Sequence, residues 1–456
     1  MKMQLAEVAR ALNIEAKEEW EDISITSVCF DSRKIESGAL FIPLVAENDG
    51  HKYVEAAING GAVATLWQED HSENIPDSIA VLPVSDTLVA LQQLGKHYLM
   101  KINPKVVAIT GSNGKTTTKD MTAAVLATQF NVHKTFANFN NEIGVPMTIL
   151  SMEPNTEVLV VEMGMDRYGQ LDFLSKLAEP DVAVITMIGE AHIEFFGTRD
   201  HIADAKMEIT HGLKEDGELV INGDEPLLTT KAKEVSQEVL TFGSLDNNDM
   251  RAMDIVSDAT KTSFKVATWP EVDFTINMIG AYNVFNALAA LSVGNIYHIP
   301  VDKMQKALAS FDLTANRTEW LEAKNGAKIL SDVYNSNPTA VKEVLYAFEQ
   351  VPTEGKRIIV LGDMLELGEK AAEMHSDLAQ AINPDRIDSV YLCGELMGYL
   401  AEKLREKFDA TQIHHYQKDD LLTLTSDLKN ELMPDDIVLL KASHGIHLEN
   451  VVSELI

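Results

Sequence analysis

Several features that define other classes of protein are scarce in this sequence. The 456 residues include two cysteines, Cys29 and Cys393, which are too few for a disulfide framework or a zinc cluster and suit a reducing compartment. Lysine and arginine number 38 against 70 acidic residues, and the net charge of -32 argues against nucleic-acid binding, which requires a basic surface. No apolar run approaches the roughly 18 residues of a membrane span, and the N-terminal stretch lacks a signal-peptide core. We therefore expect a cytoplasmic protein.

The composition and length that remain indicate a large globular protein. Hydrophobic residues make up 45% of the chain and charged residues 24%. A chain of this length exceeds one hydrophobic core and predicts about three units. Apolar runs alternate with helical patterns throughout, so we predict an α/β fold whose central unit has a parallel sheet. The helix-ending pair Asn103-Pro104 gives the first boundary. The predicted units are residues 1–102, 103–312 and 313–456.

The stretch V-V-A-I-T-G-S-N-G-K-T-T-T-K-D at residues 106–120 is typical of a phosphate-binding loop. A buried strand at Val106–Ile109 enters a glycine-rich turn, and a helical pattern begins near Thr117. Glycines allow backbone N–H groups to approach an anion, Lys115 can reach its oxygens, and the Thr116 hydroxyl can bind Mg2+. The full motif would need glycine at Ile109, so this is a shorter form. The candidate phosphate-binding residues are Gly111, Ser112, Asn113, Gly114, Lys115, Thr116 and Thr117.

Polar residues follow further predicted strands of the central unit. Glu162 ends V-L-V-V-E, and His192 comes soon after V-A-V-I-T. Ligands of parallel sheets gather at the carboxyl ends of strands, so a carboxylate and an imidazole there could hold Mg2+ or orient a phosphoryl group. Taken alone, His192 also fits a loop histidine with a structural hydrogen bond. Lys206, within the helical pattern A-D-A-K-M-E-I, reads as a solvated lysine.

Other polar clusters are compatible with binding or with ordinary turns. The Asp31-Ser32-Arg33 turn and the loop at 49–51 are ligand candidates of the first unit, although turn residues explain them equally well. The amides of Asn138, Asn140 and Asn141 suit a polar substrate or a turn. Spacing alone therefore leaves both readings open at these positions.

The last third of the chain offers residues suited to a nucleotide. Asn283 and Asn286 are spaced i, i+3 on one helix face just before this region. Arg317 can clamp phosphate oxygens, and Asp332, at a strand end, can accept hydrogen bonds from a ribose. The glycine fingerprint G-x-G-x-x-G is absent from the sequence. The region is therefore predicted to be a second α/β unit without a dinucleotide site.

Nine motifs occur in one order over nearly the whole chain: T-G-S-N-G-K-T-T-T-K-D, N-F-N-N-E-I-G-V-P, V-E-M-G, G-E-A-H-I-E-F-F-G-T, A-D-A-K-M-E-I, the Asn283/Asn286 helix, N-R-T-E-W, D-V-Y-N-S-N-P and L-G-D-M-L-E-L-G-E-K-A-A-E-M-H. Together they resemble the Mur ligases of peptidoglycan synthesis. The motifs at 332–338 and 362–368 resemble the family member that adds D-alanyl-D-alanine to UDP-N-acetylmuramoyl-tripeptide. The D-N-P-R motif of the tripeptide-forming member is absent.

The resemblance implies a fold and a reaction. It implies a central phosphate-loop ATPase domain flanked by a small N-terminal α/β domain for the UDP end and a C-terminal Rossmann-like α/β domain for the dipeptide. The tripeptide carboxylate would attack the γ-phosphoryl group of ATP, and the amine of D-alanyl-D-alanine would attack the acyl phosphate, giving the pentapeptide, ADP and phosphate. Positioning and charge neutralisation would supply most of the catalysis. A monomer is expected.

The resemblance also assigns roles to residues. Lys115 cradles phosphates, and Thr116, Glu162 and His192 hold Mg2+. Lys206 matches a lysine carried as a carbamate, an anion that supports a second Mg2+. The remaining implied contacts are Asn283 with adenine, Arg317 with the γ-phosphate, Asp332 with ribose, Ser32 and Arg33 with uridine, Asn138 and Asn141 with the muramoyl end, and Tyr334, Asn335 and Asn337 with the dipeptide.

Two positions depart from the family pattern, and two other functions stay open. Tyr282 stands where the family usually has histidine, and His444 stands where it usually has arginine, so a neutral His444 would hold an acidic group less well at neutral pH. One alternative is a related amide ligase that uses another amino acid, such as a folylpolyglutamate synthase. The other is a nucleotide-binding module without catalysis. Whether the third peptide residue is diaminopimelate or lysine is left open by the sequence.

Overall fold

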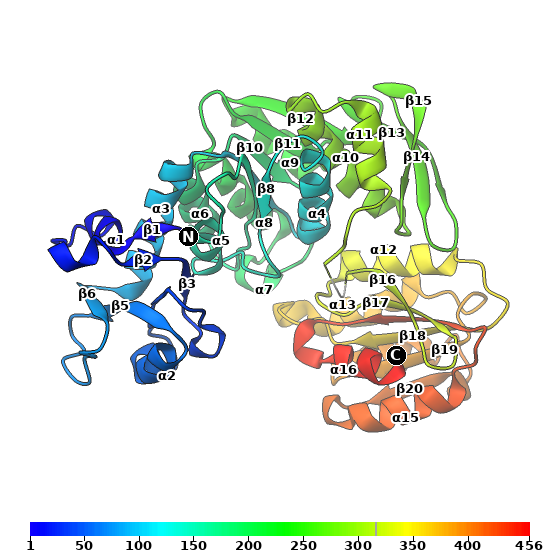
Figure 1. Ribbon diagram of the computed structural model, residues 1–456. Coiled ribbons are helices and arrows are strands. Elements are labelled where there is room, and N and C mark those ends of the chain that lie inside the picture. Colours follow the sequence, from blue (N-terminus) through cyan, green and yellow to red (C-terminus); the bar gives the residue numbers. More distant parts are fainter. Residues whose placement is uncertain (315–316) are drawn as a thin grey trace.

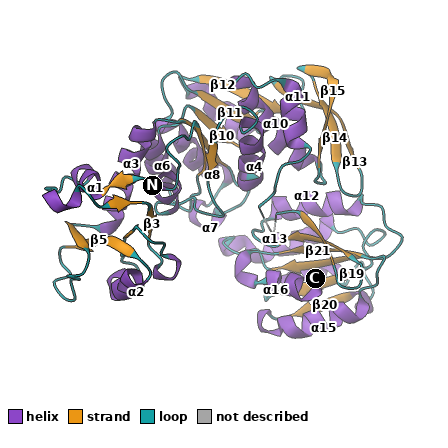
Figure 2. Cartoon of the chain, in the orientation of Figure 1, coloured by secondary structure: helices purple, strands orange, loops and turns teal. Residues whose placement is uncertain are grey.

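The computed structural model describes residues 1–314 and 317–456, so Asn316 of the N-R-T-E-W motif lies outside the described residues. The ribbon shows three α/β units in chain order, from the blue N-terminal unit through the green central unit to the yellow and red C-terminal unit (Figure 1). Helices and strands alternate through most of the chain (Figure 2). The expected fold class was a three-domain α/β architecture of the Mur ligase type. The structure confirms an α/β fold with parallel sheets.

The N-terminal unit is built on a parallel sheet of order β3-β4-β5-β6. A short antiparallel pair, β1 with β2, lies beside it. The N-terminal stretch begins as strand β1 and becomes helical at Leu5. The elements are β1 (Met3–Gln4), α1 (Leu5–Ala11), β2 (Ser24–Ile25), β3 (Ser27–Cys29), β4 (Ala39–Phe41), α2 (Val54–Asn59), β5 (Ala62–Gln68), β6 (Ala80–Val84) and α3 (Thr87–Ile102).

The central unit contains a large sheet of order β15-β14-β13-β12-β11-β10-β7-β9-β8. Its strands are parallel from β8 to β13, and β14 and β15 add an antiparallel excursion. The strands are β7 (Lys105–Thr110), β8 (Val132–Lys134), β9 (Val158–Glu162), β10 (Val182–Ile185), β11 (Glu218–Asn222), β12 (Glu238–Gly243), β13 (Met250–Ser257), β14 (Thr262–Val266) and β15 (Trp269–Ile276). The helices are α4 (Lys115–Leu126), α5 (Gly144–Leu150), α6 (Gln170–Ala178), α7 (Ile193–Phe196), α8 (Arg199–Met207), α9 (Pro226–Lys231), α10 (Ala281–Ile296) and α11 (Val301–Leu308).

Strand β7 shows how the central sheet is buried. Successive side chains of a strand point to opposite faces, and here Val106 and Ala108 enter one core while Val107 and Ile109 enter the other. The first core continues into the N-terminal unit through α3, and the second packs under α4 and α10. Strand β7 lies between β9 and β10, so the order of the sheet reverses there. The carboxyl end of β7 is therefore the expected place for a ligand crevice.

The C-terminal unit has a sheet of order β16-β17-β21-β18-β19-β20, parallel apart from the β16–β17 pair. Helices cover both faces of this sheet (Figure 1). The elements are β16 (Glu319–Glu322), β17 (Lys328–Asp332), α12 (Pro338–Glu349), β18 (Arg357–Gly362), α13 (Ala371–Asp377), β19 (Ser389–Cys393), α14 (Met397–Leu404), β20 (Ile413–Tyr416), α15 (Leu421–Glu431), β21 (Ile437–Lys441) and α16 (Leu448–Leu455).

The connection from the central unit to the C-terminal unit is tied to α4. Asp120 accepts hydrogen bonds from the backbone and the hydroxyl of Thr314, at 2.9 and 2.8 Å. Its own charge is balanced by Lys119 and Lys134, whose ammonium groups lie 2.8 and 2.6 Å away. Across the described ranges, no helix is long and apolar enough to cross a membrane.

Candidate active site

The phosphate-binding loop lies at the carboxyl end of β7 and leads directly into α4. Gly114 precedes the helix with φ of 79°, and a Cβ there would collide with the Asn286 amide. A Cβ on Gly111 would likewise collide with the Thr186 hydroxyl. Helix α4 begins at Lys115, so the expected start near Thr117 was wrong by two residues. The reason is that Gly114 supplies the left-handed turn, which makes Lys115 and Thr116 the first helical residues.

Lys115 is a half-buried cation of this loop. Its ammonium donates a hydrogen bond of 2.8 Å to the Gly111 carbonyl. Burial lowers the pKa of Lys115, the Arg317 charge lowers it further, and the Glu162 carboxylate opposes both. A cation held in a water-poor site interacts strongly with an anion such as a phosphate.

Glu162, at the end of β9, connects the loop to a second polar segment. Its Oε2 accepts a 2.9 Å hydrogen bond from the Thr116 hydroxyl, and its Oε1 accepts one of 2.8 Å from the Asn140 amide. Glu162 is buried. The carboxylate and hydroxyl oxygens are the donor types that Mg2+ prefers, so the pair predicted from sequence fits a magnesium site. The sequence singled out Asn140 only as one of a cluster of amides. In the structure its side-chain amide holds the Glu162 carboxylate in place.

Lys206, on α8, is buried, with a residue exposure of 2%. The reading as a solvated lysine is therefore wrong, because α8 packs this face of the helix inward with Ile202 and Ala203. Burial, and next the Lys115 charge, lower the pKa of Lys206 far below its usual range. Among the residues that the structure describes, no hydrogen bond or ion pair to its ammonium is found. Such a lysine is readily deprotonated to a nucleophilic amine.

His192 lies where the central and C-terminal units meet. It precedes α7 with φ of 63°, and its Nδ1 is 2.5 Å from Oε2 of Glu366 in the C-terminal unit. The imidazole lowers the pKa of Glu366. This contact between two units supports the alternative interpretation of His192, in which it is a loop histidine with a structural partner. Glu366 belongs to the G-D-M-L-E-L-G motif and was not identified as a contact of His192.

The C-terminal side of the site contains a column of stacked side chains. The Arg317 guanidinium lies 4.0 Å from the centre of the Tyr334 ring, and Tyr334 stacks on His444 with ring centres 5.5 Å apart. Next to them, Lys441 donates hydrogen bonds of 2.6 Å to Asp332 and 2.8 Å to the Asn335 carbonyl. Sequence reasoning missed Lys441 as a partner of Asp332. Each residue is the last of its strand, and the two strands are neighbours in the sheet. The position of both residues at strand ends was the feature of the sequence that could have indicated their pairing.

The α10 segment forms another wall. Asn286 donates a 3.1 Å hydrogen bond to the Asn283 side-chain oxygen, and the Asn283 amide donates one of 2.9 Å to the Ile279 carbonyl. The i, i+3 relation predicted from sequence is confirmed. The Tyr282 hydroxyl lies 3.5 Å from the Thr318 hydroxyl, and burial raises the pKa of Tyr282 far above its ordinary value. Tyr282 therefore presents a neutral phenol where the family pattern has an imidazole.

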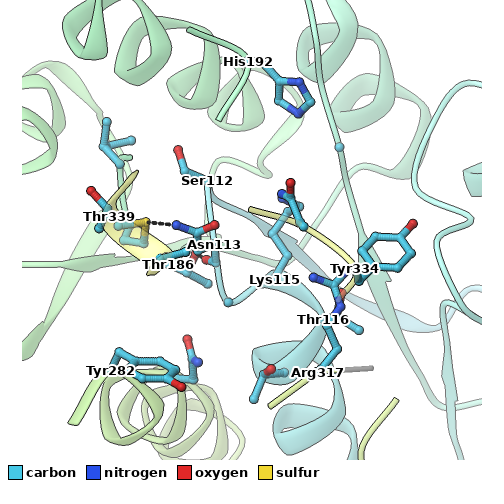
Figure 3. A pocket seen from close by; sticks show the side chains of 18 of the residues that line it. Ser112, Asn113, Lys115, Thr116, Thr186, His192, Tyr282, Arg317, Tyr334 and Thr339 are labelled. Atoms are coloured by element: carbon cyan, nitrogen blue, oxygen red, sulfur yellow. Dashed lines mark hydrogen bonds between the residues drawn. The ribbon is translucent and has the colours of Figure 1, made fainter. Parts of the chain in front are cut away.

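A cavity of about 700 Å³ joins these walls. Figure 3 shows Lys115, Thr116 and Asn113 of the central unit around the same space as Tyr334 and Thr339 of the C-terminal unit, with His192 and Tyr282 on opposite sides of the view. The predicted residues that line it are Ser112, Asn113, Gly114, Lys115, Thr116, Thr117, Asn141, Glu162, His192, Asn283, Arg317, Asp332, Tyr334 and Asn335. The predicted residues outside its lining are Ser32, Arg33, Gly111, Asn138, Lys206 and Asn337.

The N-terminal turn is separate from this cavity. The Arg33 guanidinium forms two hydrogen bonds to Asp31, of 2.8 and 2.9 Å, and its side chain is 86% exposed. Arg33 holds the pKa of Asp31 at about 2. In the neighbouring loop, Asp49 accepts from the backbone of His51 at 3.0 Å, as an ordinary turn residue would. Asn141 likewise accepts backbone N–H groups at the start of α5.

The arrangement defines a class of protein: a phosphate-loop nucleotide-binding enzyme whose site is completed by a second α/β unit. Three family models match the chain. They are described as the Mur ligase family catalytic domain at residues 24–99, the Mur ligase middle domain at 109–294 and the Mur ligase glutamate ligase domain at 316–444. The chain belongs to the Mur ligase family.

Named relatives agree with this assignment. The chain is 43% identical to the UDP-N-acetylmuramoyl-tripeptide–D-alanyl-D-alanine ligase of Bacillus subtilis (strain 168), over 97% of this chain and 95% of the relative. A crystal structure of MurF from Acinetobacter baumannii has a TM-score of 0.85 at 26% identity, covering 100% of this chain and 99% of that one. The MurF ligase from Thermotoga maritima, in complex with ADP, has a TM-score of 0.79 at 30% identity, covering 94% and 96%.

Proposed function

We propose that this enzyme is an ATP-dependent ligase that joins D-alanyl-D-alanine to UDP-N-acetylmuramoyl-tripeptide, giving the pentapeptide precursor of peptidoglycan, ADP and phosphate. The observation that carries the proposal is the cavity in which Lys115 and Glu162 of the central unit face Arg317 and Asp332 of the C-terminal unit. The names of relatives that align over nearly the full chain support the choice of substrates.

The reaction requires a carboxylate to be activated before an amine can attack it. The loop amides and the Lys115 ammonium hold the phosphates of ATP, and Arg317 neutralises charge on the transferring group. The tripeptide carboxylate attacks the γ-phosphorus, ADP leaves, and an acyl phosphate forms. The amine of D-alanyl-D-alanine then attacks the acyl carbon, and phosphate departs. The partial burial of Lys115 strengthens its contact with the phosphates because fewer water molecules compete for the charge.

Magnesium and a modified lysine fit the residues present. Thr116 and Glu162 offer oxygens for one Mg2+, and His192 stands at the edge of the same cavity. Bound Mg2+ supplies charge neutralisation for the phosphates. The depressed pKa of Lys206 favours the neutral amine, which can add CO2 and release a proton to give a carbamate. The carbamate would be an additional anionic oxygen ligand.

Carbamylation of Lys206 has a direct test that does not depend on turnover. Protein equilibrated with 13C-labelled bicarbonate should show one carbamate carbon resonance by NMR. That resonance should be lost in Lys206→Ala and kept in Lys233→Ala, a lysine of the neighbouring segment. A spectrum that is the same for wild type and Lys206→Ala would exclude the modification.

The three units would share the substrates. In this proposal residues 1–102 hold the UDP end through Ser32 and Arg33, residues 103–312 hold ATP, and residues 313–456 bring D-alanyl-D-alanine through Tyr334 and Asn335. Asn138 and Asn141 contact the muramoyl end, Asn283 contacts adenine and Asp332 contacts ribose. We further infer a cytoplasmic monomer, in keeping with its substrates.

The decisive experiment measures phosphate release with ATP, Mg2+ and UDP-N-acetylmuramoyl-tripeptide, with and without D-alanyl-D-alanine. Turnover should depend on the dipeptide, and glutamate should not replace it. Preference for glutamate would favour a folylpolyglutamate synthase type of ligase instead. Running the assay with the lysine tripeptide and the diaminopimelate tripeptide in parallel would identify the third residue.

A further inference from the structure

The amides of Asn113 and Asn337 form a reciprocal pair that joins two units of the chain. Asn113, in the phosphate-binding loop, donates a 3.2 Å hydrogen bond to the Asn337 side-chain oxygen, and Asn337 donates one of 2.7 Å back. Asn337 is buried, at 1% exposure. The two residues are 224 positions apart in sequence. The pair is therefore a specific contact, made only when the C-terminal unit is seated on the central unit.

Both partners are fixed to the elements that carry them. The Asn337 side-chain oxygen also accepts a 3.0 Å hydrogen bond from the Ala340 backbone, so the residue caps the start of α12. The main-chain carbonyl of Asn113 accepts a 2.5 Å hydrogen bond from the Thr186 hydroxyl beyond β10. Both acceptor positions of Asn337 and one of its donors are thus in use. This occupancy argues against its expected role as a contact of the dipeptide.

A second contact lies two residues further along the chain, at Thr339. Glu190 accepts hydrogen bonds from the Thr339 backbone and hydroxyl, at 3.2 and 3.1 Å. Figure 3 shows Asn113 and Thr339 close together at one side of the cavity. The first turn of α12 is consequently held against the central unit at two points, at Asn113 of the phosphate-binding loop and at Glu190 of the segment after β10. The loop that carries Tyr334 and Asn335 immediately precedes this turn, so its position over the cavity depends on the same contacts.

We propose that Asn337 is a positioning residue that locks the C-terminal unit onto the phosphate-binding loop through its amide pair with Asn113, and so sets the distance between the ATP phosphates and the dipeptide site. The proposal rests on the ligase function above for its kinetic consequences. An amide is required at both ends because each side chain must donate and accept at once. Aspartate at either end would place two oxygens against each other.

Asn337→Asp removes the hydrogen bond that Asn337 donates to Asn113 without removing the cap of α12. Aspartate is as good an N-cap as asparagine, so α12 keeps its cap while the donor to Asn113 is lost. We expect kcat to fall and KM for D-alanyl-D-alanine to rise, with kcat/KM reduced by about tenfold to a hundredfold. KM for the UDP-tripeptide should stay within about twofold, because other units hold that substrate. Asn383→Asp, an exposed asparagine of the same unit, is the control for the added charge and should match wild type.

A double-mutant cycle distinguishes a pair from two independent residues. If the pair is the lock, Asn113→Ala with Asn337→Asp should lose no more than the worse single variant. Multiplied effects of the two single variants would overturn the proposal, as would an Asn337→Asp enzyme within about twofold of wild type in both constants.

Small-angle scattering tests the lock without any turnover. Asn337→Asp should populate more extended particles than wild type and Asn383→Asp, and Asn113→Ala gives the same test from the other side of the pair. Identical scattering of both variants and wild type would overturn the lock. Absence of dipeptide-dependent turnover in the wild type, together with extended scattering of Asn337→Asp, would instead overturn the ligase assignment and leave the lock standing.

Discussion

The nucleotide cavity and the N-terminal turn both present cations beside carboxylates, but the two regions differ in their contact with water. Lys115 is half-buried and Lys206 is buried, and burial is the largest cause of their lowered pKa values. Arg33 is largely exposed and is already paired with Asp31. Charges in the cavity can therefore act strongly on a reacting group, whereas an exposed ion pair contributes little beyond orientation. The chemistry should depend on the first region, and substrate affinity on the second.

The largest effect should come from Lys115. Lys115→Ala removes the half-buried cation that would face the phosphates, and we expect kcat to fall by about a thousandfold. Lys115→Arg keeps the charge but changes its geometry and should recover only part of the rate. Phosphate release under saturating substrates is the measurement. Turnover of Lys115→Ala near the wild-type level would remove the basis for the contrast between the two regions.

Glu162→Gln should produce the next largest effect. Glutamine has the same shape as glutamate, and its side-chain amide can turn to keep the hydrogen bond with Asn140. The anionic oxygen beside Thr116 is lost, however. We therefore expect roughly a hundredfold lower kcat and a higher Mg2+ requirement. Titration of Mg2+ in the assay measures this requirement. Glu215→Gln, an exposed residue of the same unit, serves as the matched control. An unchanged Mg2+ dependence would place the metal elsewhere.

Glu343 tests the energetic cost of burial in the same cavity. Burial raises its pKa to about 7, with Lys441 opposing and Glu190 adding to the shift. The folded protein then keeps this proton at pH values where the unfolded chain has released it, so stability falls as the pH rises from about 4.5 to 7 and stays lower above that range.

Replacing Glu343 by glutamine removes this pH-dependent penalty. We expect Glu343→Gln to be more stable than wild type by about 2 kcal/mol at about pH 8 and equal to it near pH 4.5. Denaturant unfolding at the two pH values measures the difference, with exposed Glu373→Gln as control. A pH-independent difference between Glu343→Gln and wild type would show that the carboxyl does not titrate in this window.

The smallest effect should come from the N-terminal turn. Arg33→Ala removes an exposed guanidinium, so we expect about fivefold weaker binding of the UDP-tripeptide and unchanged affinity for ATP. Calorimetric titration of each ligand separates the two effects, and Lys34→Ala controls for the loss of one positive charge in the same turn. A loss of ATP affinity in Arg33→Ala would contradict the division between the two regions.

Local sequence patterns predicted much of the architecture. The alternation of strands and helices, the parallel central sheet and the pairing of Asn283 with Asn286 follow from periodicities of a few residues, because these interactions are made within one element or between neighbours. The start of α4 was misplaced by two residues because helix boundaries depend on the local turn at Gly114, which sequence reasoning placed inside the loop.

Contacts between distant elements were beyond such patterns. The residues next to Lys206 in the sequence are those expected around a solvated lysine. Its burial results from how α8 packs against the rest of the central unit. Asn140 was one of several similar amides until the structure showed its hydrogen bond to Glu162. Lys441 and Asp332 are paired because β21 and β17 are adjacent, although 109 residues separate them.

The sequence by itself determined that this protein has a glycine-rich phosphate loop between a buried strand and a helix, since that requirement is local and only a few residue types satisfy it. The family resemblance extended this to a ligase reaction. Only the tertiary structure decided which charges are buried, which amides are already paired and how the C-terminal unit meets the loop. Those properties depend on desolvation and on contacts between residues hundreds of positions apart, such as Asn113 and Asn337, and no short sequence pattern records them.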